Sequence, residues 1–323
     1  SEILTAAAFR NALIVTQSIG GSTNALIHLT AVAGRLGIRV DLDEFDALGR
    51  EVPVLIDLKP SGQHYMEHFH WAGGVPRLLR ELEGLLDTSA RTVTGSLRDT
   101  LQTATDTHAQ TVIRPRSDPI NASGSMAVLR GNLAPRGAII KQSAASPKLM
   151  QHTGRAVVFD SLEDLAARID DDALDVSADD VLVLRNAGPK GAPGMPEAGY
   201  LPIPKKLARA GTKDMVRISD ARMSGTAFGT IVLHVTPESA VGGPLALVRN
   251  GDRIQLDVAA RRIELLVGDA ELAKRRAQAG AVVEPTNSEP KFARGYAALF
   301  MRSVLQADQG CDFDFLVPPG MSN

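Results

Sequence analysis

The sequence has a single cysteine, no long hydrophobic run and no block of charge of one sign. Cys311 has no second cysteine to form a disulfide with inside the chain, and one thiolate is too few to hold an iron-sulfur cluster. No apolar run approaches the roughly 20 residues of a membrane-spanning helix, and the N-terminus lacks the basic and then apolar pattern of a signal peptide. We therefore expect a cytoplasmic protein that does not bind membranes.

The charges are balanced as well as scattered. The 35 basic and 37 acidic residues leave a net charge of −2, and no basic stripe of the kind that binds nucleic acid is present. We expect no nucleic-acid partner. The 323 residues, of which 44% are hydrophobic, are enough for roughly two domains with cores of their own.

The first third of the chain has mainly helical patterns. Apolar residues recur at three- and four-residue spacing, or follow helix-start signals, in residues 6–17, 24–36, 43–49, 75–86 and 96–104. Residues 54–58 predict a buried strand, and the polar, proline-containing residues 107–125 predict a domain junction. We expect residues 1–115 to form part of an α/β domain.

The remainder, residues 116–323, has the pattern of a β-barrel with peripheral helices. Helices are predicted at residues 162–169, 204–210 and 270–277. Short β-type runs separated by Gly, Pro and Asp turns occur at residues 126–129, 138–141, 155–159, 181–184, 216–218, 230–235, 254–258 and 262–267.

Ser224 follows one of these runs, in the segment DARMSGT at residues 220–226. A serine hydroxyl acts as a base only where positive charge stabilises its deprotonated form. Gly225 would let the backbone approach a ligand, and Thr226 adds a second hydroxyl. By its spacing alone, the same tripeptide is equally typical of a turn at the end of a strand.

Glu197 lies on a loop that is dense in glycine and proline, at residues 188–199. A carboxylate on a restrained loop can bind a hard cation such as Mg²⁺ at little ordering cost. The alternative is a solvated side chain, which is the usual state of a glutamate on a loop.

Two further motifs have competing interpretations. Residues 20–24, GGSTN, lie between two predicted helices, so Ser22 and Thr23 could bind an anion with neighbouring N–H groups or could simply cap the second helix. Residues 64–68 fit the H-x-x-E-H zinc pattern. Their bulky, turn-flanked context favours a surface helix or a contact with another subunit, and we expect no zinc site there.

The segments at residues 20–24, 185–200 and 216–248 together resemble the IlvD/Edd dehydratase family, over nearly the whole chain. The resemblance covers only the C-terminal portion of such enzymes. It implies a partial α/β domain followed by a swivelling β/β/α domain like a barrel. It also implies that Ser224 is the catalytic base, that Glu197 is a magnesium ligand, and that four residues contact the substrate: Ser22, Thr23, Arg222 and Thr226.

The implied activity is that of a hydro-lyase that converts a sugar acid to its 2-keto-3-deoxy acid with a 2Fe-2S cluster and Mg²⁺. The form ARMSGTA favours an aldonate, such as the pentonates arabinonate and xylonate. Because the cluster ligands would lie in a missing N-terminal half, we expect this chain alone to be inactive, and the enzyme to be a homo-oligomer. The alternatives are a dihydroxy-acid dehydratase and a non-catalytic module that binds sugar acids.

Overall fold

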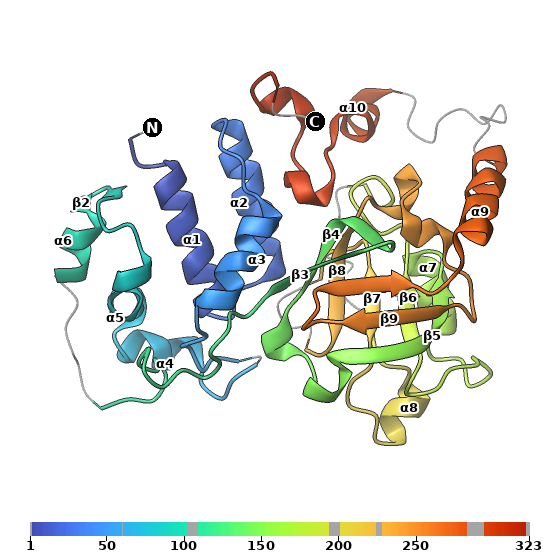
Figure 1. Cartoon of the computed structure of the whole chain (residues 1–323), viewed down its shortest axis with the longest axis horizontal. Helices are drawn as coiled ribbons and strands as arrows, with labels where there is room; N and C mark the ends of the chain where they lie inside the picture. The colour runs from blue at the N-terminus through green and yellow to red at the C-terminus, as the bar shows by residue number, and fades with distance from the viewer. Residues whose placement is uncertain are drawn as a thin grey trace.

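The structure is a computed structural model that describes residues 2–59, 61–102, 109–193, 201–223, 228–282 and 294–320. Its N-terminal part is helical and lies beside a β-barrel, as Figure 1 shows. Thr5, Ser22 and Asp41 each accept a hydrogen bond from a backbone N–H as helix caps. The helices of this part are α1 (Ala6–Ser18), α2 (Thr23–Arg35), α3 (Leu42–Glu51), α4 (Met66–Trp71), α5 (Gly74–Glu81) and α6 (Leu97–Gln102).

The predicted buried strand at residues 54–58 does not extend a sheet. Its residues form only isolated bridges, antiparallel with Asn121 and Ile113 and parallel with His64, because each neighbouring segment pairs with it at a single residue. The one described sheet of this part is the short hairpin of β1 (Arg91–Thr92) and β2 (Gly95–Ser96). The hydrophobic core of the N-terminal part includes buried residues of α1, α2 and α3 together with Val112 and Ile113.

The barrel prediction is confirmed. Eight strands close in the order β10-β3-β4-β8-β7-β6-β5-β9, and each of the eight predicted β-type runs corresponds to one of them. The strands are β3 (Ala127–Gly131), β4 (Ala134–Ile140), β5 (Gln151–Phe159), β6 (Val181–Leu184), β7 (Arg217–Ser219), β8 (Ile231–Thr236), β9 (Arg253–Asp257) and β10 (Arg262–Leu265).

Strands β5, β6, β7 and β8 are consecutive and parallel. Alternate side chains of these strands face opposite sides: Val158 and Val183 fill the barrel interior, whereas Val157 and Leu182 pack outside it against helix α7 (Leu162–Arg168). Because the four strands run in one direction, the loops that follow β6 and β7 leave the barrel at the same end.

Helix α8 (Lys205–Arg209) lies between β6 and β7 in the sequence. Two further helices follow the last strand, α9 (Asp269–Val282) and α10 (Gly295–Ser303). Helix α10 was not predicted. The segment after it contacts both α2 and β8, and Arg35 of α2 pairs with Asp312 at 2.6 Å. Short 3-10 helices occupy Glu83–Leu85, Gln142–Ala144, Pro147–Leu149, Ser239–Val241, Pro244–Leu247, Ala307–Gln309 and Asp314–Leu316.

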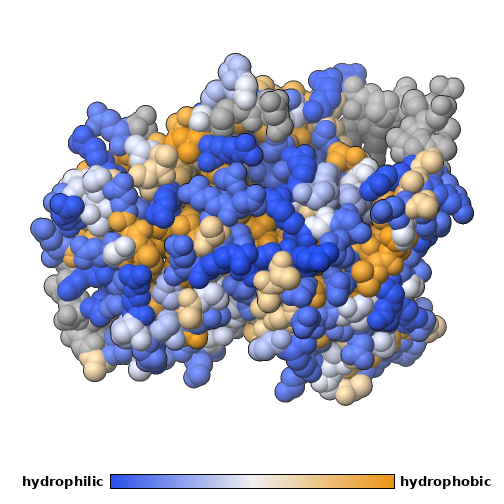
Figure 2. All heavy atoms as spheres, viewed as in Figure 1, coloured by the Kyte–Doolittle hydropathy of each residue, from blue (hydrophilic) through white to orange (hydrophobic). Residues whose placement is uncertain are grey.

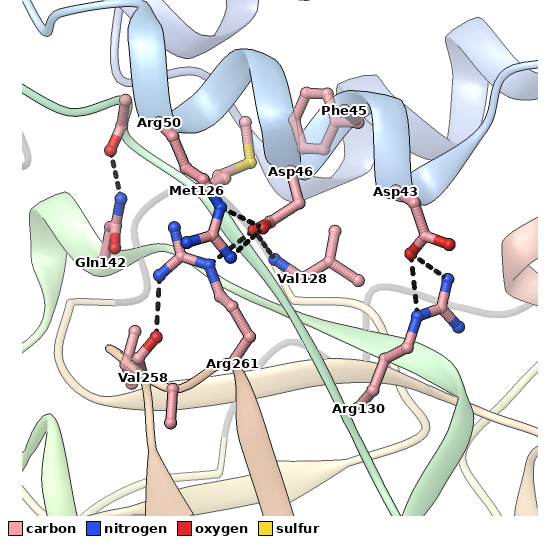
Figure 3. Close-up of polar contacts among 12 residues, drawn as sticks. Asp43, Phe45, Asp46, Arg50, Met126, Val128, Arg130, Gln142, Val258 and Arg261 are labelled. Atoms are coloured by element: carbon pink, nitrogen blue, oxygen red, sulfur yellow. Dashed lines mark hydrogen bonds and ion pairs between the residues drawn. The ribbon is translucent and has the colours of Figure 1, made fainter.

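A buried carboxylate joins α3 to the barrel, as Figure 3 shows. Asp46 accepts hydrogen bonds from the Val128 N–H at 3.0 Å and from Arg261 Nε at 2.7 Å, and it also pairs with Arg50 of its own helix. Asp43, one turn earlier, pairs with Arg130 near the surface. The helical part and the barrel are therefore held together by charged hydrogen bonds as well as by apolar packing.

Hydrophilic residues cover most of the face drawn in Figure 2, and hydrophobic residues appear there in separate patches. Within the described ranges, no helix combines the length and the apolar character needed to cross a membrane.

Candidate functional site

Two loops leave the same end of the barrel and are tied together at their first residues. One follows β6 and the other follows β7. Asp220, directly after β7, accepts hydrogen bonds from the backbone N–H groups of Asn186 at 3.3 Å and Ala187 at 3.0 Å, both just beyond β6. It also accepts one from the Ser239 N–H at 2.9 Å. Only 1% of Asp220 is exposed, and this burial raises the pKa of its carboxyl group above the usual range.

The turn between α1 and α2 reaches the same place. The side-chain amide of Asn24 donates to the backbone oxygen of Met223 at 3.0 Å, and Thr23 Oγ1 lies 3.3 Å from His234 Nε2 of β8. Met223 immediately precedes Ser224. Three segments far apart in the sequence, the GGSTN turn and the loops after β6 and β7, therefore meet at one end of the barrel.

The predicted contacts Ser22 and Thr23 have distinct roles in this turn. Ser22 is the N-cap of α2, because its hydroxyl accepts from the Asn24 N–H at 3.2 Å. The capping interpretation is therefore confirmed for Ser22. Thr23 is the first residue of the helix and is 6% exposed, with its hydroxyl directed at His234.

The predicted catalytic Ser224, its neighbour Thr226 and the predicted magnesium ligand Glu197 lie outside the described residues. Arg222 is described and half-buried, and it lines a cavity of about 600 Å³ with Pro189 and Cys311. Helix α2 forms another wall of this cavity. A guanidinium on the wall of such a space can pair bidentately with a carboxylate.

Two residues near this site were not predicted to be functional: the sequence favoured a packing or hydrogen-bonding role for His234, and Lys141 was not considered. His234 is 3% exposed and has a positive φ of 56° within β8, where the register with β4 shifts. Lys141, directly after β4, donates to the backbone oxygen of Gly20 at 2.6 Å, and its burial lowers the pKa of its ammonium group. Lys141 lies directly after β4, and a charged residue at the end of a predicted strand is a sequence signal that could have identified it. No periodic pattern marks His234, because its role depends on a bulge.

The described residues do not by themselves make up a metal or cluster site. They include no group of three His, Cys, Asp or Glu side chains placed to hold a metal ion. Burial raises the pKa of the Cys311 thiol to about 12, with the nearby Glu238 carboxylate adding to the shift.

Residues 66–68 of the H-x-x-E-H segment begin the exposed helix α4, which has no buried residue, so the predicted surface helix is confirmed. His64 and His68 contact each other edge to face at 5.5 Å, and Trp71 is 58% exposed. A contact with another subunit at this helix stays a prediction.

Comparison with known families matches both parts of the chain. Residues 1–101 match the model "Dihydroxy-acid/6-phosphogluconate dehydratase N-terminal", and residues 111–311 match the corresponding C-terminal model. The chain belongs to this dehydratase family. The predicted resemblance to IlvD/Edd dehydratases is thereby confirmed.

Curated relatives are similar over nearly the whole chain. It is 53% identical to the L-arabonate dehydratase of Azospirillum brasilense over 98% of this chain and 55% of that protein. It is 51% identical to the 6-deoxy-6-sulfo-D-gluconate dehydratase of Pseudomonas putida over 95% and 52%. It is 41% identical to the dihydroxy-acid dehydratase of Syntrophobacter fumaroxidans over 96% and 54%. The chain therefore spans about half the length of the curated relatives it matches.

Proposed function

We propose that this chain is the part of a sugar-acid dehydratase that carries the catalytic base, acting on an aldonate such as arabinonate or xylonate. The observation that supports the proposal most directly is the Asp220 carboxylate, which joins the first residues of the Glu197 loop to the segment that leads into Ser224. The two motifs are separated by more than 20 residues in the sequence, and this link brings their loops to one end of the barrel.

The reaction removes one water molecule from a 2,3-dihydroxy acid. In the proposed assignment, Ser224 takes the proton from C2 while the hydroxyl on C3 departs, and the resulting enol rearranges to the 2-keto-3-deoxy acid. Arg222 pairs with the substrate carboxylate from the wall of the adjoining cavity, and Thr226 and Thr23 offer hydroxyls to the sugar chain. Asn24 holds the Met223 carbonyl and so fixes the start of the Ser224 loop.

The proposal includes a 2Fe-2S cluster and Mg²⁺, with Glu197 as one magnesium ligand and the remaining ligands outside this chain. When bound, these groups would supply the positive charge that lowers the cost of removing protons from hydroxyl groups. Because the chain spans about half the length of the curated relatives it matches, we expect the isolated 323 residues to be inactive. We further propose that the active protein is a homo-oligomer in the cytoplasm.

The closing assay measures the 2-keto-3-deoxy acid formed from a pentonate by the full-length protein. Ser224→Ala should lower kcat by about 10²–10⁴-fold, as expected for loss of a general base. Ser123→Ala, which removes an exposed hydroxyl bonded to Asn121, is the matched control and should leave kcat unchanged. Wild-type-like turnover by Ser224→Ala would overturn the assignment of the base.

Two alternatives predict different outcomes. A dihydroxy-acid dehydratase would turn over 2,3-dihydroxyisovalerate in preference to the pentonate. The 41% identity to one such enzyme is the reason to assay both substrates. A non-catalytic module would bind the aldonate in calorimetry without metal and would turn over neither substrate. The higher identities to sugar-acid dehydratases favour the aldonate.

A further inference from the structure

A second buried carboxylate, Glu238, lies against the loop that leads to Glu197. Its oxygens accept hydrogen bonds from the backbone N–H of Lys190 at 3.0 Å and of Gly191 at 2.9 Å. Only 1% of Glu238 is exposed. The loop folds closely around this side chain, since a Cβ added at Gly188 would lie 2.5 Å from Glu238 Oε2.

The other side of Glu238 is held by the C-terminal segment. Gln306 donates its side-chain amide to Glu238 Oε1 at 2.6 Å and accepts from the Glu238 N–H at 2.9 Å, so the two residues bind each other reciprocally. Gln306 belongs to the segment that contacts α2 and β8. Glu238 is therefore fixed from behind by one element while it holds the backbone of another.

The Glu238 carboxylate is costly to bury, and its hydrogen bonds come from the Lys190 and Gly191 backbone and from Gln306. Burial raises the pKa of Glu238 above the usual range, and the charge of Asp220 adds to this shift, whereas the hydrogen bonds from Gly191, Gln306 and Lys190 oppose it. Glu238 has no arginine or lysine partner among the ion pairs of the described residues. Its carboxylate oxygens accept from two backbone N–H groups of the loop and from one side-chain amide. We call this set of hydrogen bonds, which holds the loop backbone, the clamp.

We propose that Glu238 is a positioning residue that holds residues 188–191, and through them the loop carrying Glu197, in the geometry that the reaction requires. The inference rests on the proposed function for its catalytic consequence, but the clamp itself is a property of this chain. A glutamine at this position cannot satisfy all three donors, because its NH₂ group would face an N–H or the Gln306 amide.

The test compares Glu238→Gln with Asp180→Asn in the full-length protein. Asp180 is also buried, accepts from the Ser177 N–H and pairs with Arg155, but it lies at the opposite end of β6 from the loop. Hydrogen exchange of the peptide that covers residues 186–193 is followed by mass spectrometry, and kcat and KM for a pentonate are measured separately.

We expect Glu238→Gln to raise the exchange rate of this peptide at least tenfold and to lower kcat at least tenfold with KM changed less than threefold. Asp180→Asn should leave both the exchange of this peptide and kcat unchanged, even where it lowers the melting temperature. If Glu238→Gln does not fold, Gly188→Ala displaces the same carboxylate from the loop side and should give the same two effects.

Unchanged exchange in the folded variant would overturn the inference whatever the enzyme turns over. Faster exchange with wild-type kcat would overturn the positioning role. Faster exchange in a protein whose wild type dehydrates no aldonate would instead refute the proposed function and leave the clamp established.

Discussion

Acid should destabilise this protein through His234, the buried histidine of β8. Burial lowers the pKa of His234 from its usual 6.5 to about 3, and the positive charges of Arg222 and His28 add to the shift. The imidazole is 3% exposed, its Nε2 faces Thr23, and its Nδ1 has no hydrogen-bond partner among the described residues. The folded protein therefore keeps this side chain neutral over a pH range in which the unfolded chain protonates it.

The sign and the size of the change in the free energy of unfolding with pH follow from proton linkage. Because the folded pKa lies below the unfolded one, the stabilising contribution is complete above pH 6.5 and is lost as the pH falls toward about 3. Each pH unit within that window costs about 1.4 kcal/mol. Between about pH 7 and about pH 5, His234 alone should lower the free energy of unfolding by about 2 kcal/mol.

The assay is urea unfolding of the wild type and of His234→Asn at both pH values. Asparagine tolerates the positive φ of this position and does not titrate, so the variant should lose about 2 kcal/mol less than the wild type on acidification. Thr23→Val removes the hydroxyl partner but keeps the buried imidazole, and it should retain the wild-type pH dependence. Equal pH dependence in the wild type and in His234→Asn would refute the reasoning.

Three further variants test the fold and the site. Asp46→Asn, which weakens the buried pair with Arg261, should lower the free energy of unfolding by about 2 kcal/mol in urea, whereas Asp43→Asn, whose side chain is 73% exposed, should lower it by less than about 1 kcal/mol. Gly191→Ala would place a Cβ 2.6 Å from the backbone of the same loop, so it should reduce kcat on a pentonate while the melting temperature stays within a few degrees, and an unchanged kcat would contradict this. Lys141→Met, which removes a charged hydrogen bond to the backbone of the GGSTN turn, should raise KM for the pentonate about tenfold, whereas a wild-type KM would show that the tether is not needed.

The regular elements of the barrel were predictable because their signals are local. Alternating or continuous apolar runs separated by turn residues mark all eight strands. Because side chains in a strand alternate between its two faces, those of β6 pack alternately into the barrel interior and into the core outside it. Helices α1 and α2 were predicted from the spacing of their apolar residues, and α3 from the acidic residues at its start. Helix α10 was not, and residues 54–58 look like a strand but only form single bridges.

The site was predictable only in part. The residue types at 20–24, 197 and 222–226, with their resemblance to one family, were enough to name candidates and a reaction class, and the family is confirmed. The roles of Asp220, Lys141, His234 and Glu238 were not visible, because each depends on a group supplied by a distant segment, which is a backbone group for Asp220, Lys141 and Glu238 and the Thr23 hydroxyl for His234. The predicted roles of Ser224 and Glu197 remain predictions, as do the substrate contacts predicted for Ser22, Thr23, Arg222 and Thr226.

What this sequence determined by itself was the set of strands and helices, and the residues with the chemistry to bind anions, metals or protons, since these depend on neighbours within a few positions along the chain. Only the tertiary structure decided which of those residues meet. The parallel run from β5 to β8 brings the loops after β6 and β7 to one end of the barrel, and Asp220 and Asn24 join them there. A hydrogen bond such as that from Asn24 to Met223, which joins residues 199 positions apart, leaves no periodic mark in the sequence, because the partners become neighbours only when the chain folds.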